Sequence, residues 1–116
     1  MKIISKSSIK KTAGRGMFIT ATPRNRGLSM SADLIRALGF KGKSEGFLTL
    51  AQNERGYLAM KAGEESADSF RVHRYGWTMR ILGTAPITPP SPDGKPRRFL
   101  VEKVGEWFIS EMRVNV

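Results

Sequence analysis

The spacing of apolar positions changes several times along the first half of the chain, and each change predicts a new element. Strand-forming residues fill positions 17–22, and apolar and polar residues alternate over 27–30, so both stretches are predicted strands. Apolar side chains then recur at helical spacing from Leu34 to Leu38. We therefore expect two strands followed by a short helix over about residues 32–39.

The ends of this predicted helix carry start and stop signals. Ser31 stands immediately before it, where a hydroxyl can cap free backbone N–H groups. Asp33 places a negative charge in the first turn, where the helix dipole favours one. Gly39 can adopt the left-handed conformation that ends a helix, so about two turns are expected.

A β-hairpin is predicted directly after the helix. Apolar residues lead into Asn53 over 47–50 and lead out of Gly56 over 57–60. Asn and Gly both tolerate the positive φ angles of tight turns. The residues between them are therefore expected to form the turn.

The second half shows strand patterns on both sides of a proline-rich stretch. Residues 70–81 are predicted to form one strand, and a change of alternation at His73 and Arg74 indicates a bulge there. The prolines of residues 86–96 exclude helix and central strand, so this stretch is an expected exposed loop. A final hairpin is predicted over 98–114.

These elements predict a mostly β protein of the α+β class. The expected architecture is barrel-like or swapped-hairpin, with two β-hairpin units and one short helix. Residues 1–116 fit a single domain by length. An offset of 52 residues superimposes Phe18 on Phe70 and suggests an internal duplication of 14–62 in 66–114. The alternative is that any two hairpins share such features.

Residue types limit the chemistry. The chain has no cysteine and one histidine, which excludes a disulfide framework, a thiolate metal site and a metal centre of several imidazoles. His73 is flanked by Arg71 and Arg74, and no carboxylate near it in sequence could orient it as a base. We therefore expect no enzymatic activity, no metal and no other cofactor.

The distribution of apolar residues argues against a membrane partner. No apolar run approaches the roughly 20 residues of a membrane span. The stretch that follows Met1 is basic but lacks the apolar core of a signal peptide. A cytoplasmic location is therefore expected.

Positive charge is concentrated at the N-terminal end. The net charge is +10, from 20 Lys and Arg against 10 Asp and Glu. Residues 1–43 hold ten of the Lys and Arg and only one acidic residue, Asp33. Such a segment attracts polyanions, nucleic acid above all. The alternatives are a solubilising face and a face for a protein partner with an acidic surface.

The helix segment also resembles a known family. Ser31-Ala-Asp-Leu-Ile-Arg-Ala-Leu-Gly-Phe is similar to the Pro-x-Glu-Leu-Arg-x-x-Leu-Gly-Ile segment of AbrB/SpoVT/MazE-type swapped-hairpin DNA-binding proteins. In that family, as expected here over residues 26–62, a strand precedes the segment and a hairpin follows it. The resemblance implies DNA binding, transcription regulation and a homodimer. It places the DNA contacts on Arg24 and Arg26, and on Arg15.

The basic residues of the N-terminal half form the first candidate site. The predicted nucleic-acid-binding residues are Lys10, Lys11, Arg15, Arg24, Arg26, Lys41 and Lys43. The alternative for them is a solvated loop. A second set, Arg71, His73 and Arg74, alternates with aromatic residues as on a base-stacking platform. For that stretch the favoured alternative is core packing, with one buried face made of Tyr75, Trp77, Met79 and Ile81.

The pattern as a whole predicts a nucleic-acid-binding regulatory protein that acts through an N-terminal basic surface. DNA is favoured over RNA as the partner. The alternative function is a small phage-type inhibitor or adaptor that binds a host protein without enzymatic activity.

Overall fold

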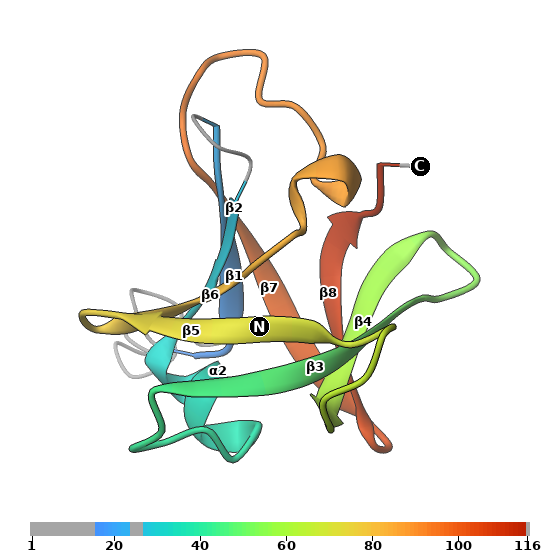
Figure 1. Ribbon diagram of the computed structural model, residues 1–116. Coiled ribbons are helices and arrows are strands. Elements are labelled where there is room, and N and C mark those ends of the chain that lie inside the picture. The colour runs from blue at the N-terminus through green and yellow to red at the C-terminus, as the bar shows by residue number, and fades with distance from the viewer. Residues whose placement is uncertain (1–15, 24–26, 116) are drawn as a thin grey trace, which may run out of the picture.

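The described part of the chain is built around one antiparallel sheet of eight strands. The computed structural model describes residues 16–23 and 27–115 (Figure 1). The strands are β1 (Phe18–Thr22), β2 (Gly27–Met30), β3 (Glu45–Gln52), β4 (Tyr57–Gly63), β5 (Phe70–Tyr75), β6 (Thr78–Ile81), β7 (Arg97–Val104) and β8 (Trp107–Arg113). The helix α2 (Ala32–Ala37) and the 3₁₀ turn η1 (Ala85–Ile87) complete the regular elements of these residues. The predicted mostly β, α+β class is confirmed.

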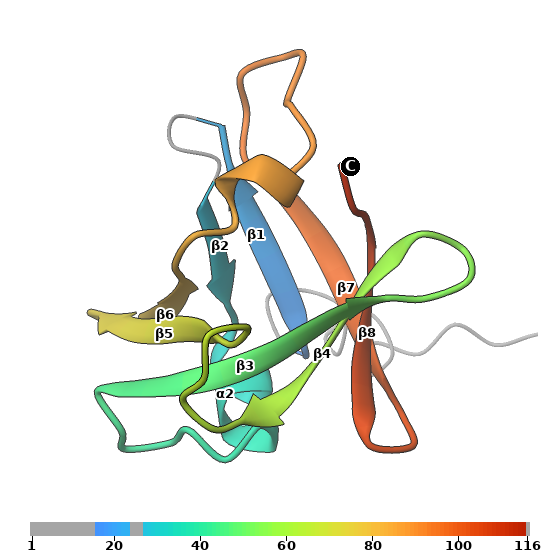
Figure 2. The same ribbon diagram turned by 45° about the vertical axis from the view of Figure 1, so that its right-hand side comes forward.

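The sheet closes on itself as a barrel. The strand order is β1-β2-β6-β5-β3-β4-β8-β7, and β7 pairs with β1. Each of these eight strands therefore has a neighbour on both sides along at least part of its length. Figure 1 and Figure 2 both show α2 near one end of the sheet and η1 near the other.

The helix α2 starts at the predicted signal but ends earlier than expected. Ser31 is the N-cap, and its side chain accepts a hydrogen bond from the Leu34 backbone N–H at 3.4 Å. The last helical residue is Ala37, because Leu38 is the C-cap and Gly39 takes a φ of +85°. No helix of the described residues has the length and apolarity to cross a membrane.

Both predicted hairpins are present. In the β3–β4 turn, the side-chain oxygen of Asn53 accepts hydrogen bonds from the backbone N–H groups of Arg55 (3.0 Å) and Tyr57 (2.8 Å). In the β7–β8 turn, Val104 pairs with Trp107, and Gly105 supplies a φ of +64°. Local turn chemistry was thus sufficient to predict these two units.

The expected single strand over 70–81 is wrong. Two strands, β5 and β6, fold back on each other through a turn at Gly76, which has a φ of +62°. The β5–β6 pairing is continuous and contains no bulge at His73 and Arg74. The alternation changes because the turn between the two strands has two residues. Inward-facing residues therefore have even numbers on β5, such as Val72, and odd numbers on β6, such as Met79.

The proline-rich stretch is an exposed loop over most of its length, but its start is ordered and buried. Thr84 and Thr88 are buried on either side of η1, and the Thr88 hydroxyl donates to the Thr84 carbonyl at 2.8 Å. Further along, the Lys95 backbone N–H and the Ser91 hydroxyl donate to the Asp93 carboxylate, which lowers its pKa from the ordinary value. The loop is therefore organised by its own polar groups.

The core fills the interior of the barrel. Every strand of the barrel supplies side chains to it, α2 adds Leu34 and Ile35, and the C-cap residue Leu38 is buried with them. Leu34 and Leu38 belong to the same buried cluster as Leu48 and Leu58 of the β3–β4 hairpin. Because α2 contributes to this cluster, it is anchored firmly at one end of the barrel.

The two halves of the chain share one pairing scheme. Exchanging β1, β2, β3 and β4 for β5, β6, β7 and β8 leaves the circular strand order unchanged. The 52-residue offset, however, places buried Ile19 on exposed Arg71. Burial matches instead when Ile19 corresponds to Val72 and Leu28 corresponds to Met79, because the β5–β6 turn is two residues shorter than the β1–β2 connection. The internal duplication stays a prediction.

Candidate nucleic-acid interface

The predicted binding residues fall in three places. Five of them, Lys10, Lys11, Arg15, Arg24 and Arg26, lie outside the described residues. Lys41 and Lys43 lie on the exposed connection between α2 and β3. Arg71, His73 and Arg74 lie on β5. The structure therefore tests the arrangement of the last two groups.

The connection that carries Lys43 lies against the end of β5. The Arg74 backbone N–H donates to the Ser44 carbonyl at 2.8 Å, and the Arg74 Nε donates to the Lys43 carbonyl at 3.0 Å. Two predicted sites that are distant in sequence are thereby brought together. Lys41, Lys43 and Arg71 are exposed, whereas His73 and Arg74 are half-buried.

Outward-facing polar side chains form a row across neighbouring strands. The pairings place Arg98 of β7 beside Thr20 of β1, Thr20 beside Ser29 of β2, and Ser29 beside Arg80 of β6. Arg80 is in turn paired with His73 of β5. From β7 to β5 the row consists of Arg98, Thr20, Ser29, Arg80 and His73. We call this set the basic row; exposed Glu45 of β3 follows His73 and ends it.

One end of the basic row opens into a groove of about 670 Å³ beside α2. We call it the helix groove. Its lining includes hydroxyl groups of β1, β2 and β6 and residues of α2 and of the β5–β6 turn. The lining also includes Phe18, Ser31, Asp33, Arg36, Trp77 and Arg98.

Hydrogen bonds of Ser31 fix the position of α2 at the groove. Its hydroxyl donates to the Gly16 carbonyl at 2.9 Å and accepts from the Phe18 N–H at 3.0 Å, in addition to capping the helix. Asp33 of α2 accepts from the Gly16 N–H at 2.8 Å. The start of β1 and the start of α2 are therefore held together by side-chain to backbone hydrogen bonds.

Two guanidinium groups line the groove. Arg98 lies over the ring of Phe18, 4.2 Å from its centroid, which is a close cation–π contact. Arg36 pairs with Asp33 at 3.3 Å while its side chain remains 63% exposed. Asp33 is the groove's only acidic residue among those described, and it already accepts hydrogen bonds from Arg36 and Gly16. The positive charge of Arg98 is therefore left without a compensating carboxylate in the groove.

Trp77 occupies the tip of the β5–β6 turn and also lines the groove. Its side chain is 94% exposed. The expected buried face of Tyr75, Trp77, Met79 and Ile81 is therefore correct only for Met79 and Ile81, because the turn directs Tyr75 and Trp77 to solvent. Arg80 lies over the Tyr75 ring at 5.6 Å, so aromatic and basic groups do alternate on the outer surface.

Four residues of this surface were not predicted as binding residues: Arg36, Trp77, Arg80 and Arg98. For Arg80 a signal existed, since it alternates with buried Met79 and Ile81. For Trp77 the signal was its place after Gly76, a turn residue. Arg98 carried no local signal, because its position in the groove depends on the pairing of β7 with β1.

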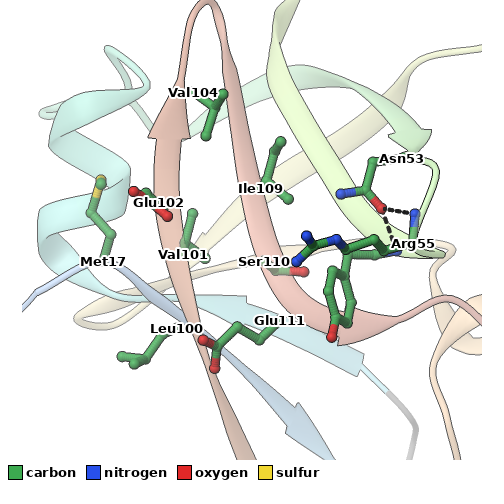
Figure 3. Close-up of a pocket in the computed structure, with 11 residues that line it drawn as sticks. Met17, Asn53, Arg55, Leu100, Val101, Glu102, Val104, Ile109, Ser110 and Glu111 are labelled. Carbon is green, nitrogen blue, oxygen red and sulfur yellow. Dashed lines mark hydrogen bonds between the residues drawn. The ribbon is translucent and has the colours of Figure 1, made fainter.

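A second groove, of about 530 Å³, lies on the outer side of β7 and β8. We call it the β7–β8 groove. Figure 3 shows Glu102, Val104 and Ile109 of these strands beside Asn53 and Arg55 of the β3–β4 turn. Glu102 and Glu111 make it more acidic than the helix groove, and Leu100 and Val104 are more than half exposed.

No group of three or more histidine, aspartate or glutamate side chains is placed to hold a metal ion in residues 16–23 and 27–115. Comparison with protein-family models, curated proteins and solved structures finds no match for the chain. The relationship to AbrB/SpoVT/MazE-type proteins therefore stays a prediction.

Proposed function

We propose that this protein binds nucleic acid, DNA in the first place, as a regulatory protein without enzymatic activity. The basic row, together with the helix groove, is the observation that carries the proposal. It places Arg98, Arg80 and His73 on one outer surface that spans five adjacent strands. Guanidinium groups arranged along a surface match the repeating charge of a phosphate backbone.

The charge balance of the molecule divides the attraction for a polyanion between this surface and the bases outside the described residues. All ten acidic residues lie in the described part of the chain, with thirteen of the twenty Lys and Arg. That part is therefore nearly balanced, and a polyanion is attracted only where bases are gathered away from acids. The remaining seven bases, which include Arg24 and Arg26, would add to the affinity.

The test is a salt titration of a labelled random duplex followed by fluorescence anisotropy. Each lost phosphate contact lowers the slope of log K against log salt by about 0.9 on duplex DNA. Replacing Arg80 and Arg98 together with Ala should weaken binding and flatten that slope. The matched control replaces Arg97 and Arg113, which are not in the basic row and remove the same charge.

The proposal fails if the wild-type chain shows no salt-sensitive retention of DNA or RNA at low ionic strength. It also fails if the control pair causes the same loss as the pair from the basic row. In the first case the charge serves solubility or a protein partner. In the second case the contact depends on net charge and not on this surface.

One observation favours the second function, an inhibitor or adaptor that binds a host protein. Leu100 and Val104 expose 56% and 52% of their surfaces on the same face of β7, and exposed aliphatic residues that share a face are typical of protein contacts. The homodimer expected from the sequence would use the same kind of surface. Replacing both residues with Ser, followed by light scattering and partner capture, tests whether this surface binds protein.

A further inference from the structure

Trp77 is the most exposed large apolar side chain of the described residues. It belongs to a two-residue turn in which Gly76 provides the positive φ, so the fold needs no aromatic residue there. At 94% exposure the indole contributes little to the core. A large aromatic surface that is left in water beside a basic groove is a feature of contact residues.

The groups around Trp77 suit one kind of ligand. Arg98, stacked on Phe18, and Arg36, on α2, supply guanidinium donors to the lining of the same groove. Thr20 and Ser29 add hydroxyl groups to that lining. A flat ring, fixed cations and hydroxyls complement a base, a phosphate and a sugar respectively.

We propose that the helix groove binds an unpaired stretch of nucleic acid, with one base stacked on Trp77 and the adjoining phosphates on Arg98 and Arg36. This inference rests on the proposed function and narrows its ligand. In a duplex both faces of every internal base are covered by neighbouring bases, so a ring at a hairpin tip can stack only on a base that is outside the helix. The contact therefore selects single strands, loops or ends.

The experiment uses the intrinsic fluorescence of Trp77. The chain has two tryptophans, and replacing Trp107 with Phe leaves Trp77 as the only indole. Titrating this variant with a thymidine homopolymer of about 12 nucleotides, close to the site sizes of single-strand-binding folds, should quench the emission in a saturable way. A long duplex at the same nucleotide concentration, in which almost every base is internal, should quench it much less, even where anisotropy shows that the duplex binds.

Two matched pairs of variants assign the contacts. Trp77→Ala should lower single-strand affinity by about fivefold or more, the loss of one base stack, and Trp77→Phe should keep part of it. The same replacements at Trp107 are the control. Trp107 also flanks a hairpin turn, but Lys61 lies over its ring at 4.6 Å. Arg98→Ala should flatten the single-strand salt slope by about 0.7, whereas Arg97→Ala on the same strand should change it less.

The outcomes separate this inference from the proposed function. If the protein binds duplex and single strand equally and Trp77→Ala changes neither, the inference is overturned while nucleic-acid binding stands. If the wild type binds neither, the proposed function fails and the inference fails with it. If light scattering shows that Trp77→Ala changes the oligomeric state, a second copy of the chain occupies the groove and the inference is also overturned. Circular dichroism on the variant confirms that it is folded.

Discussion

The helix groove and the β7–β8 groove are similar in size and differ in chemistry. Their volumes are about 670 and 530 Å³. The first combines Arg36 and Arg98 with an exposed tryptophan, whereas the second combines Glu102 and Glu111 with exposed aliphatic residues. Size therefore does not identify the ligand, and the sign of the charge together with the type of apolar side chain does.

The strand β7 shows how closely the two surfaces are related. Its outward residues pass from Arg98, in the helix groove, through Leu100 to Glu102, in the β7–β8 groove. Two residues along one strand are about 7 Å, so the character of the surface changes within a short distance. A polyanion in the helix groove would meet Glu102 if it extended along β7, which limits the contact surface on that side.

The largest expected difference between the grooves is in stability. Leu34→Ala removes a fully buried side chain that anchors α2 beside the helix groove and should cost about 2–5 kcal/mol. Leu100→Ala makes the same chemical change in the β7–β8 groove, where the side chain is 56% exposed, and should cost about 0.5 kcal/mol or less. Urea denaturation of both variants measures the difference. Equal losses would mean that α2 is peripheral to the fold.

A change of charge in the β7–β8 groove should make the two grooves more alike in their attraction for nucleic acid. Glu102→Lys combined with Glu111→Lys changes the net charge of the residues that line the β7–β8 groove, which include Arg55, from negative to positive, as in the helix groove. New phosphate contacts should each steepen the salt slope by about 0.7 on single strands, with an increase in affinity that disappears at high salt. Anisotropy titrations measure both effects.

Quenching of the Trp77 fluorescence distinguishes the effect of added charge from that of a stacking contact. The double lysine variant should bind more tightly at low salt without gaining any quenching, because the new groove has no exposed tryptophan. If Trp77→Ala had no effect in the wild type and the lysines alone set the affinity, charge would be sufficient and the stacking contact would be unnecessary.

The local signals of the sequence were reliable for the scaffold. Ser31 caps α2, and Asn53 organises the β3–β4 turn through two hydrogen bonds to its side chain. Each of these features depends on residues within four positions of one another, so the chain itself displays them. The mostly β class followed from the same evidence.

Non-local pairing explains what the sequence did not display. The turn at Gly76 was missed because Tyr75, Trp77, Met79 and Ile81 alternate with polar residues or Gly and could also be read as one strand face. Only the pairing of Val72 with Ile81 reveals the hairpin. The groove partners Phe18 and Arg98 are brought together by the closure of the barrel. Leu48 and Leu100 are equivalent at the 52-residue offset, but Leu48 is buried and Leu100 is exposed. Side chains alternate between the two faces of a strand, so a shift of one residue in register decides which face a side chain takes.

The smallest expected difference compares one serine from each groove. Ser31→Ala removes an acceptor of two backbone N–H groups and a donor to a third residue, and should cost about 1–2 kcal/mol. Ser110→Ala removes a buried hydroxyl that donates to the Leu58 carbonyl at 3.1 Å and accepts from the Met112 N–H, and should cost about 1 kcal/mol. Thermal or urea denaturation measures both losses.

Single-strand affinity should distinguish the two serine variants more clearly than their stabilities do. Ser31 holds the start of β1 against the start of α2, so its loss should loosen the helix on which Arg36 lies and reduce single-strand affinity. Ser110 lines the other groove, and its loss should leave that affinity unchanged. If both variants bound like the wild type, the helix groove would tolerate displacement of α2, and the phosphate contact would belong to Arg98 and not to Arg36.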